Sequence, residues 1–214
     1  MRKAKSGFAS VFIQSKASKS GKLMIIGGND GSVQNRVEFF SMSDLQWHKC
    51  SSMICKRDEL AAVVGSDNLV YAIGGYGGSQ NTSCLSSVER FDPATNTWEQ
   101  VASMNEGRRA LAAVSLPDGI YAIGGYNGKD YISSIERYDI LRNEWRIVCH
   151  LNSAKCTMSA VPSPDFQSIL IIGGFNGVQL NEVERCDIAT KTCVLFDPPM
   201  SQRRFMHSSV MTLE

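Results

Sequence analysis

The stretch Val70-Tyr71-Ala72-Ile73-Gly74-Gly75 decides the fold, because it recurs three more times along the chain. Its counterparts are Leu23-Met24-Ile25-Ile26-Gly27-Gly28, Ile120-Tyr121-Ala122-Ile123-Gly124-Gly125 and Ile169-Leu170-Ile171-Ile172-Gly173-Gly174. Short apolar runs that are rich in β-branched residues and stopped by glycine predict buried strands. The Gly-Gly doublets lie 47, 50 and 49 residues apart, a spacing that is typical of propellers, solenoids and other repeat arrays.

Further positions recur after each doublet in the same order. A third glycine follows at Gly31, Gly78, Gly128 and Gly177. A β-branched residue with a glutamate comes next, at Val37-Glu38, Val88-Glu89, Ile135-Glu136 and Val183-Glu184. An aromatic residue and then a tryptophan follow as the pairs Phe40 and Trp47, Phe91 and Trp98, and Tyr138 and Trp145. In the last repeat these two positions are Cys186 and Cys193, which we expect on adjacent strands.

Each repeat ends in a link in which a Met or Leu precedes a basic residue by four positions. The pairs are Met53 and Arg57, Met104 and Arg108, Leu151 and Lys155, and Met200 and Arg204. A small apolar strand follows the base, as at 60–64 and 110–114. One repeat therefore predicts four short strands and no helix. A four-stranded sheet cannot bury both of its faces alone, so the sheets must pack on one another, as propeller blades do.

The two ends of the chain fit the same spacing. Met1 and Lys5 stand where Met104 and Arg108 stand, so residues 8–13 predict the first strand of the first blade. The alternative for this basic, acid-free opening is a transit peptide. Residues 205–210 predict the first strand of an incomplete fifth repeat. We expect blades at about 1–52, 53–103, 104–150 and 151–199, with a partial repeat at 200–214.

Composition narrows the class of protein. The chain has 214 residues, 43% of them hydrophobic, and a formal net charge of +1, which argues against disorder and against a dedicated nucleic-acid binder. No apolar run approaches 18 residues, so no membrane-spanning helix is expected.

Seven cysteines without a Cys-x-x-Cys motif predict free thiols in a reducing, cytoplasmic setting and no metal or other cofactor. A disulfide between Cys186 and Cys193 stays open.

The doublet, the glutamate, the aromatic pair and the Met-x-x-x-Arg link together resemble the kelch repeat over essentially the whole chain. The resemblance implies an all-β, kelch-type β-propeller of four complete four-stranded blades plus one extra strand. Kelch propellers usually close with six or seven blades, so the chain is expected to form part of a larger propeller. Closure with four blades is the alternative.

The order of strands predicts a binding face. In an antiparallel blade, the links before the first strand and the loops after the Gly-Gly doublets lie at the same edge. The links bring Arg57, Arg108, Arg109, Lys155, Arg203 and Arg204 to this face, and the loops bring Asn29, Asp30, Tyr76, Tyr126, Asn127, Lys129, Tyr131, Phe175 and Asn176. Arg and Tyr are enriched in protein-recognition hot spots. We predict partner contacts by Arg109, Tyr126, Asn127, Tyr76, Phe175, Arg203, Arg204 and Arg108, although the recurring base Arg108 can instead be structural.

The function expected from these features is a non-enzymatic protein-binding module. The chain has no Gly-x-Ser-x-Gly, His-Glu-x-x-His or phosphate-loop motif. The resemblance implies a protein partner, often with an acidic peptide segment, and a role as a ubiquitin-ligase substrate adaptor or a cytoskeletal scaffold. The rival is a galactose-oxidase-like copper enzyme, but His48, His150 and His207 occupy non-equivalent positions in their repeats. Open blade edges also predict self-association.

Overall fold

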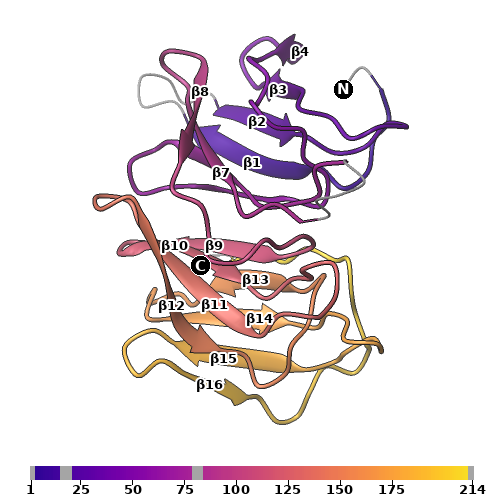
Figure 1. Ribbon diagram of the computed structural model, residues 1–214, viewed down its shortest axis with the longest axis vertical. Coiled ribbons are helices and arrows are strands. Elements are labelled where there is room, and N and C mark those ends of the chain that lie inside the picture. The colour runs from indigo at the N-terminus through magenta and orange to yellow at the C-terminus, as the bar shows by residue number, and fades with distance from the viewer. Residues whose placement is uncertain (1–2, 15–20, 79–83, 212–214) are drawn as a thin grey trace.

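A computed structural model describes residues 3–14, 21–78 and 84–211, which form sixteen strands and no helix (Figure 1). These residues accordingly include no helix that could cross a membrane.

The strands form four sheets. Blade 1 contains β1 (Ala9–Gln14), β2 (Gly21–Ile26), β3 (Val37–Ser41) and β4 (Gln46–Lys49). Blade 2 contains β5 (Ala61–Val64), β6 (Val70–Ile73), β7 (Val88–Asp92) and β8 (Thr97–Val101). Blade 3 contains β9 (Ala112–Leu116), β10 (Gly119–Ile123), β11 (Ser134–Asp139) and β12 (Glu144–His150). Blade 4 contains β13 (Ser159–Pro162), β14 (Ser168–Ile172), β15 (Val183–Asp187) and β16 (Thr192–Leu195).

Each blade is an antiparallel meander in which every strand pairs with the next one along the chain. The first strands of neighbouring blades contact each other, β1 with β5, β5 with β9 and β9 with β13. They are therefore the inner strands, and β4, β8, β12 and β16 are the outer ones. The expectation of an all-β propeller with four four-stranded blades is confirmed. The predicted first strand forms as β1, within the basic opening for which a transit peptide was the alternative.

Apolar side chains fill the space between consecutive blades in three separate clusters. Tyr71 and Ile73 of blade 2, for example, pack against Ile120 and Trp145 of blade 3. The Trp145 indole donates a hydrogen bond to the Ala102 carbonyl of the preceding blade at 3.0 Å. Burying a large apolar side chain contributes about 1.5–3 kcal/mol. Burial and this polar anchor explain why aliphatic runs and tryptophan recur with the period of the blades.

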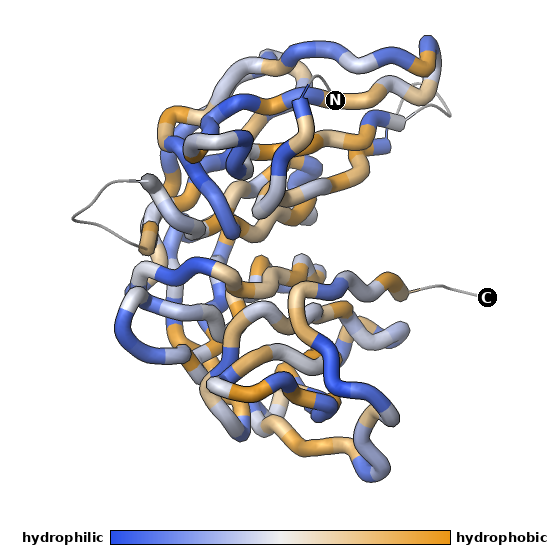
Figure 2. Tube along the Cα trace, turned by 90° about the vertical axis from the view of Figure 1, so that its right-hand side faces the viewer, coloured by the Kyte–Doolittle hydropathy of each residue, from blue (hydrophilic) through white to orange (hydrophobic). Residues whose placement is uncertain are grey.

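Backbone hydrogen bonds tie the links together around the inner strands. Glu59 donates to Gly7, Ala110 to Glu59, Thr157 to Ala110 and Met206 to Thr157, each at 2.8 or 2.9 Å. These five residues occupy equivalent positions, and all have positive φ between 50° and 61°. No apolar cluster in the described part of the chain joins blade 4 to blade 1. The four blades therefore form an open arc, which Figure 2 shows from the side.

The extra strand predicted for residues 205–210 is not formed, so this part of the fold prediction is wrong. The link that precedes it is in place, since the Arg204 amide donates to Leu180 and its carbonyl accepts from Gly174, both at 2.8 Å. In each blade the inner strand is held by the strand that follows it, as β6 holds β5. No described strand lies beside 205–210, so the segment has no ladder to join.

The two cysteines in the aromatic positions of the last repeat are joined. Cys186 and Cys193 lie directly opposite each other on β15 and β16 and form a disulfide. The sequence left this pairing open, and the cross-strand opposition of the two residues brings their side chains together. The matching positions of blade 3, Tyr138 and Trp145, are opposed in the same way. Among the remaining cysteines, Cys50, Cys55, Cys149 and Cys156 are free thiols.

Candidate functional site

The links and loops share one edge of the arc, as the order of strands predicts. A residue of each link forms an antiparallel bridge with a residue of the loop in the same blade. The bridges join Ser6 to Asn29, Asp58 to Tyr76, Arg109 to Tyr126 and Cys156 to Phe175. We call this surface the loop face. It consists of the four loops that follow the Gly-Gly doublets and the links that precede the inner strands.

Four aromatic rings from blades 3 and 4 and the last link form a row on the loop face. The ring centroids of Tyr126 and Tyr131 are 5.5 Å apart, those of Tyr131 and Phe175 6.0 Å, and those of Phe175 and Phe205 5.9 Å. The rings line a hollow of about 370 Å³, together with Glu59, Arg109, Ala110, Cys156, Thr157 and Met206. A concave aromatic surface of this kind suits an apolar side chain of a partner.

Arg109 lies at one end of this row. Its guanidinium is 5.6 Å from the Tyr76 ring centroid and 5.4 Å from that of Tyr126. It also forms an ion pair with Glu59 at 3.5 Å. The Nε atom of Arg109 is buried and has no hydrogen-bond partner among the described residues. Stacking on aromatic rings orders the side chain, and a third of it stays exposed for contact with a ligand.

The Arg108 side chain does not reach the loop face. It is 0% exposed and forms an ion pair with the equally buried Glu136. It also donates hydrogen bonds to the carbonyls of Gly124 at 2.9 Å and Ser134 at 3.1 Å. Burial lowers the pKa of Arg108, and Glu136 opposes this effect. Assigning Arg108 to partner binding is therefore wrong, because its donors are used inside the blade.

The bases of two other links are buried in the same way. Arg57 pairs with Glu89 at 3.0 Å, and Lys155 pairs with Glu182 at 2.9 Å and with Glu184. These cations do not contribute to the expected basic surface either. The repeated glutamate is the matching anion, and its buried carboxylate also accepts backbone hydrogen bonds from the preceding link. Ile54, for example, donates to Glu89 at 2.6 Å.

The remaining predicted residues lie on the loop face but not all of them reach the hollow. Asn127 donates to Glu106 at 2.6 Å and accepts from the amides of Lys129 and Asp130, so it shapes its own loop. Arg203 and Arg204 are exposed in the last link. Tyr76 is half-buried beneath Arg109. Part of the Tyr76 loop, residues 79–83, lies outside the described residues.

Sequence reasoning missed Phe205 and Glu59 as members of the site. Phe205 directly follows the link base Arg204, just as Arg109 follows Arg108 and Cys156 follows Lys155. Since Arg109 and Cys156 bridge to their loops, the repeat spacing places Phe205 at the same edge. That spacing was the available signal for Phe205. Glu59 is marked by no motif and is identified only through its ion pair.

The described residues contain one grouping with the composition of a metal site, Glu184, Cys186 and Cys193. The two cysteines are bonded to each other and Glu184 pairs with Lys155. These groups are committed to one another and offer no free ligand set. The Cys156 thiol beside the hollow is buried, which raises its pKa and keeps it protonated near neutral pH.

Comparison with known proteins agrees with this architecture. Residues 10–213 match the family KLHDC2/KLHL20/DRC7 Kelch-repeats domain. The F-box/kelch-repeat protein At5g03020 of Arabidopsis thaliana is 42% identical over 67 residues, covering 31% of this chain and 19% of that protein. Human Kelch repeat and BTB domain-containing protein 13 is 37% identical over 99 residues, covering 45% and 21%. Human Kelch-like protein 23 is 31% identical over 93 residues, covering 44% and 16%.

The chain thus matches between 16% and 21% of the length of these relatives. The family match, in contrast, spans nearly the whole chain. It covers the same four blades in which the Gly-Gly doublet and the glutamate recur. By its repeats, its blades and this match, the chain belongs to the kelch-repeat family.

Proposed function

We propose that the chain is a non-enzymatic module that binds a protein partner through its loop face. The observation that carries the proposal is the row of Tyr126, Tyr131, Phe175 and Phe205 around a hollow, with Arg109 stacked at its end. Aromatic and arginine side chains that are held in place before binding lose little entropy when a partner docks. The hollow takes an apolar side chain of the partner.

The proposed partner carries an acidic residue beside its apolar anchor. Glu59 partly neutralises the charge of Arg109, so the basic patch on the loop face is smaller than the number of basic link residues predicts. Arg203 and, in a single copy, Arg204 are exposed on the adjoining link and add positive charge beside Phe205. Charge complementarity of this kind steers association and favours acidic over basic segments.

The cellular role that we propose is substrate recognition for a ubiquitin ligase, in the cytoplasm. Two of the relatives are named for an F-box or a BTB domain beside their kelch repeats. An actin-associated scaffold is the alternative. A copper enzyme finds less support, because His48 bonds to Asp44 and His150 to Ser133, in separate blades. Self-association through the open blades is a separate proposal, developed below.

We expect Arg109→Glu and Tyr126→Ala each to weaken partner binding by roughly thirtyfold, or about 2 kcal/mol. The first reverses a charge on the loop face, and the second removes the ring that supports both Arg109 and Tyr131. Partners captured from extract by the wild-type chain would be identified and then titrated against each variant. Circular dichroism would verify that the variants stay folded.

Arg142→Glu is the matched control for the charge reversal. Arg142 lies in the turn between β11 and β12, at the opposite edge of blade 3, and its side chain is 69% exposed. We expect this variant to bind as the wild type does. If Arg142→Glu abolishes binding while Arg109→Glu and Tyr126→Ala leave it intact, the binding face is the opposite one.

A further inference from the structure

Blade 4 leaves an apolar sheet face uncovered. On this face Ile172 is half-buried, whereas its equivalents Ile73 and Ile123 are fully buried by the next blade. Phe196 at the outer edge is 47% exposed, whereas its equivalent Val101 packs against the apolar cluster between blades 2 and 3. The equivalent apolar surface of the other blades is buried by the next blade, so this exposed surface favours contact with another blade.

Blade 1 leaves the complementary face uncovered. Phe8 and Leu23 are 37% and 36% exposed, although the equivalent residues in later blades are buried against the preceding blade. The Trp98 indole donates to the Ser51 carbonyl of blade 1 at 2.9 Å. The equivalent Trp47 is half-exposed, and its indole makes no hydrogen bond with any described residue.

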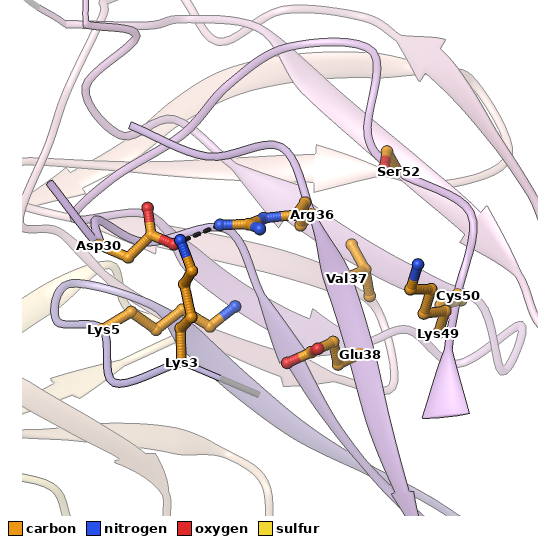
Figure 3. A pocket seen from close by; sticks show the side chains of 9 residues that line it. All are labelled: Lys3, Lys5, Asp30, Arg36, Val37, Glu38, Lys49, Cys50 and Ser52. Atoms are coloured by element: carbon orange, nitrogen blue, oxygen red, sulfur yellow. Dashed lines mark hydrogen bonds and ion pairs between the residues drawn. The ribbon is translucent and has the colours of Figure 1, made fainter. Parts of the chain in front are cut away.

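The two open faces also carry unmatched charges. Arg204 is equivalent to the buried bases of the other links, but it is exposed and forms no ion pair within the described residues. Glu38 is equivalent to Glu89, yet it is half-exposed. It attracts Lys5 electrostatically but makes no hydrogen bond or close ion pair with the described residues. Figure 3 shows Glu38 beside a hollow of about 400 Å³ that Lys3 and Lys5 also line.

We propose that the two open faces bind each other between copies of this chain, head to tail. Blade 4 of one copy covers blade 1 of a second copy, and Arg204 pairs with Glu38 of the second copy. The Trp47 indole of the second copy donates to the Pro198 carbonyl. Pro198 stands two residues before Met200, as Ser51 stands two residues before Met53.

Features of the chain itself favour a second copy as the partner of the open faces. The same contact already occurs three times within the chain, with the same positions buried on both sides. The charges are also complementary, since the exposed Arg204 lies on one open face and Glu38, which faces the loosely held Lys5, lies on the other. Each interface joins unlike surfaces, so the assembly is a closed ring or an open series of copies.

Docking requires movement in both copies, because residues 3–12 and 202–211 occupy equivalent positions in the repeat. His207 already lies close to Gly173, where Phe8 of the second copy would pack. We infer that residues 207–211 of the first copy and residues 3–7 of the second copy move. Arg57 makes five side-chain hydrogen bonds in the slot of blade 2, whereas Lys5 makes none with the described residues of blade 1. Burial disfavours the charged form of Lys5 and lowers its pKa. Glu38 attracts this charge, and Arg36, which stands where blade 2 has Ser87, repels it. Arg36 itself pairs with Asp30, as Figure 3 shows.

The test is a charge exchange read by light scattering coupled to gel filtration. The wild-type chain should give a mass above the 23.5 kDa of one copy. Arg204→Glu and Glu38→Arg each place like charges at the interface, and each should weaken association on the order of a hundredfold. An equimolar mixture of the two variants should associate again. In the mixture the introduced glutamate faces the introduced arginine at one interface, and the native Arg204 faces the native Glu38 at the next.

Three outcomes would overturn the proposal: a monomeric wild-type chain, association that persists in either variant alone, or a mixture that stays monomeric. Phe196→Asp on the open face of blade 4 provides an independent variant and should also yield monomers. Arg142→Glu, which changes the same type of charge away from both faces, should associate as the wild type does. Circular dichroism on every variant separates loss of association from loss of the fold.

Discussion

Replacing Arg108 by methionine is expected to lower the free energy of unfolding by about 3–5 kcal/mol. Methionine keeps the apolar length of the side chain but leaves the Glu136 carboxylate buried without its cation. The carbonyls of Gly124 and Ser134 lose their donor at the same time. Unsatisfied groups in a buried site cannot recover hydrogen bonds with water, so the loss exceeds that of an exposed ion pair.

Urea unfolding at neutral pH measures this effect, with Arg109→Met as the matched control. Arg109 is the next residue, is partly exposed and pairs with Glu59 at the surface, so its replacement should cost under about 1 kcal/mol. Adding Glu136→Gln to Arg108→Met should recover part of the loss, because the buried charge is then gone. Equal midpoints for Arg108→Met and the wild type would show that the buried pair does not hold blade 3 together.

Replacing Gly124 by valine is expected to destabilise the chain by about 2–5 kcal/mol, from backbone strain and overpacking together. Gly124 has φ +54°, where a β-branched residue is strained. A Cβ atom there would meet the Lys155 carbonyl oxygen at 2.7 Å and the Met158 Cε atom at 2.3 Å. The backbone of the next link cannot give way without opening the interface between blades 3 and 4.

Two alanine variants separate the strain from the contact. Gly177 has φ +106°, but a Cβ atom there would meet nothing within 4 Å. Gly177→Ala therefore reports backbone strain alone. Gly125→Ala, at the similar φ of +110°, reports strain plus the close approach of the Arg109 carbonyl oxygen, which a Cβ atom would meet at 2.9 Å. We expect the larger loss of unfolding free energy for Gly125→Ala. Equal losses would show that the second glycine of the doublet recurs for its backbone conformation and not for its close approach to the link.

Much of the fold follows from local sequence. The run Val70–Ile73 is a strand because β-branched and aromatic residues suit a buried pleated surface, and Gly74 ends it by turning the chain. The spacing of the repeats places Trp98 and Trp145 on outer strands against the preceding blade. The shared edge of links and loops also follows, since it depends only on the order of antiparallel strands.

What the tertiary structure decided is how neighbouring residues divide between interior and surface. Arg108 and Arg109 are neighbours with identical side chains. Arg108 points to carbonyls and a carboxylate that are supplied by other parts of blade 3. Arg109 instead stacks on Tyr76 of blade 2 and pairs with Glu59. Local periodicity carries no information about partners brought from 16 or more residues away. The strand predicted at 205–210 failed for the same reason, because a strand exists only where another strand accepts its hydrogen bonds.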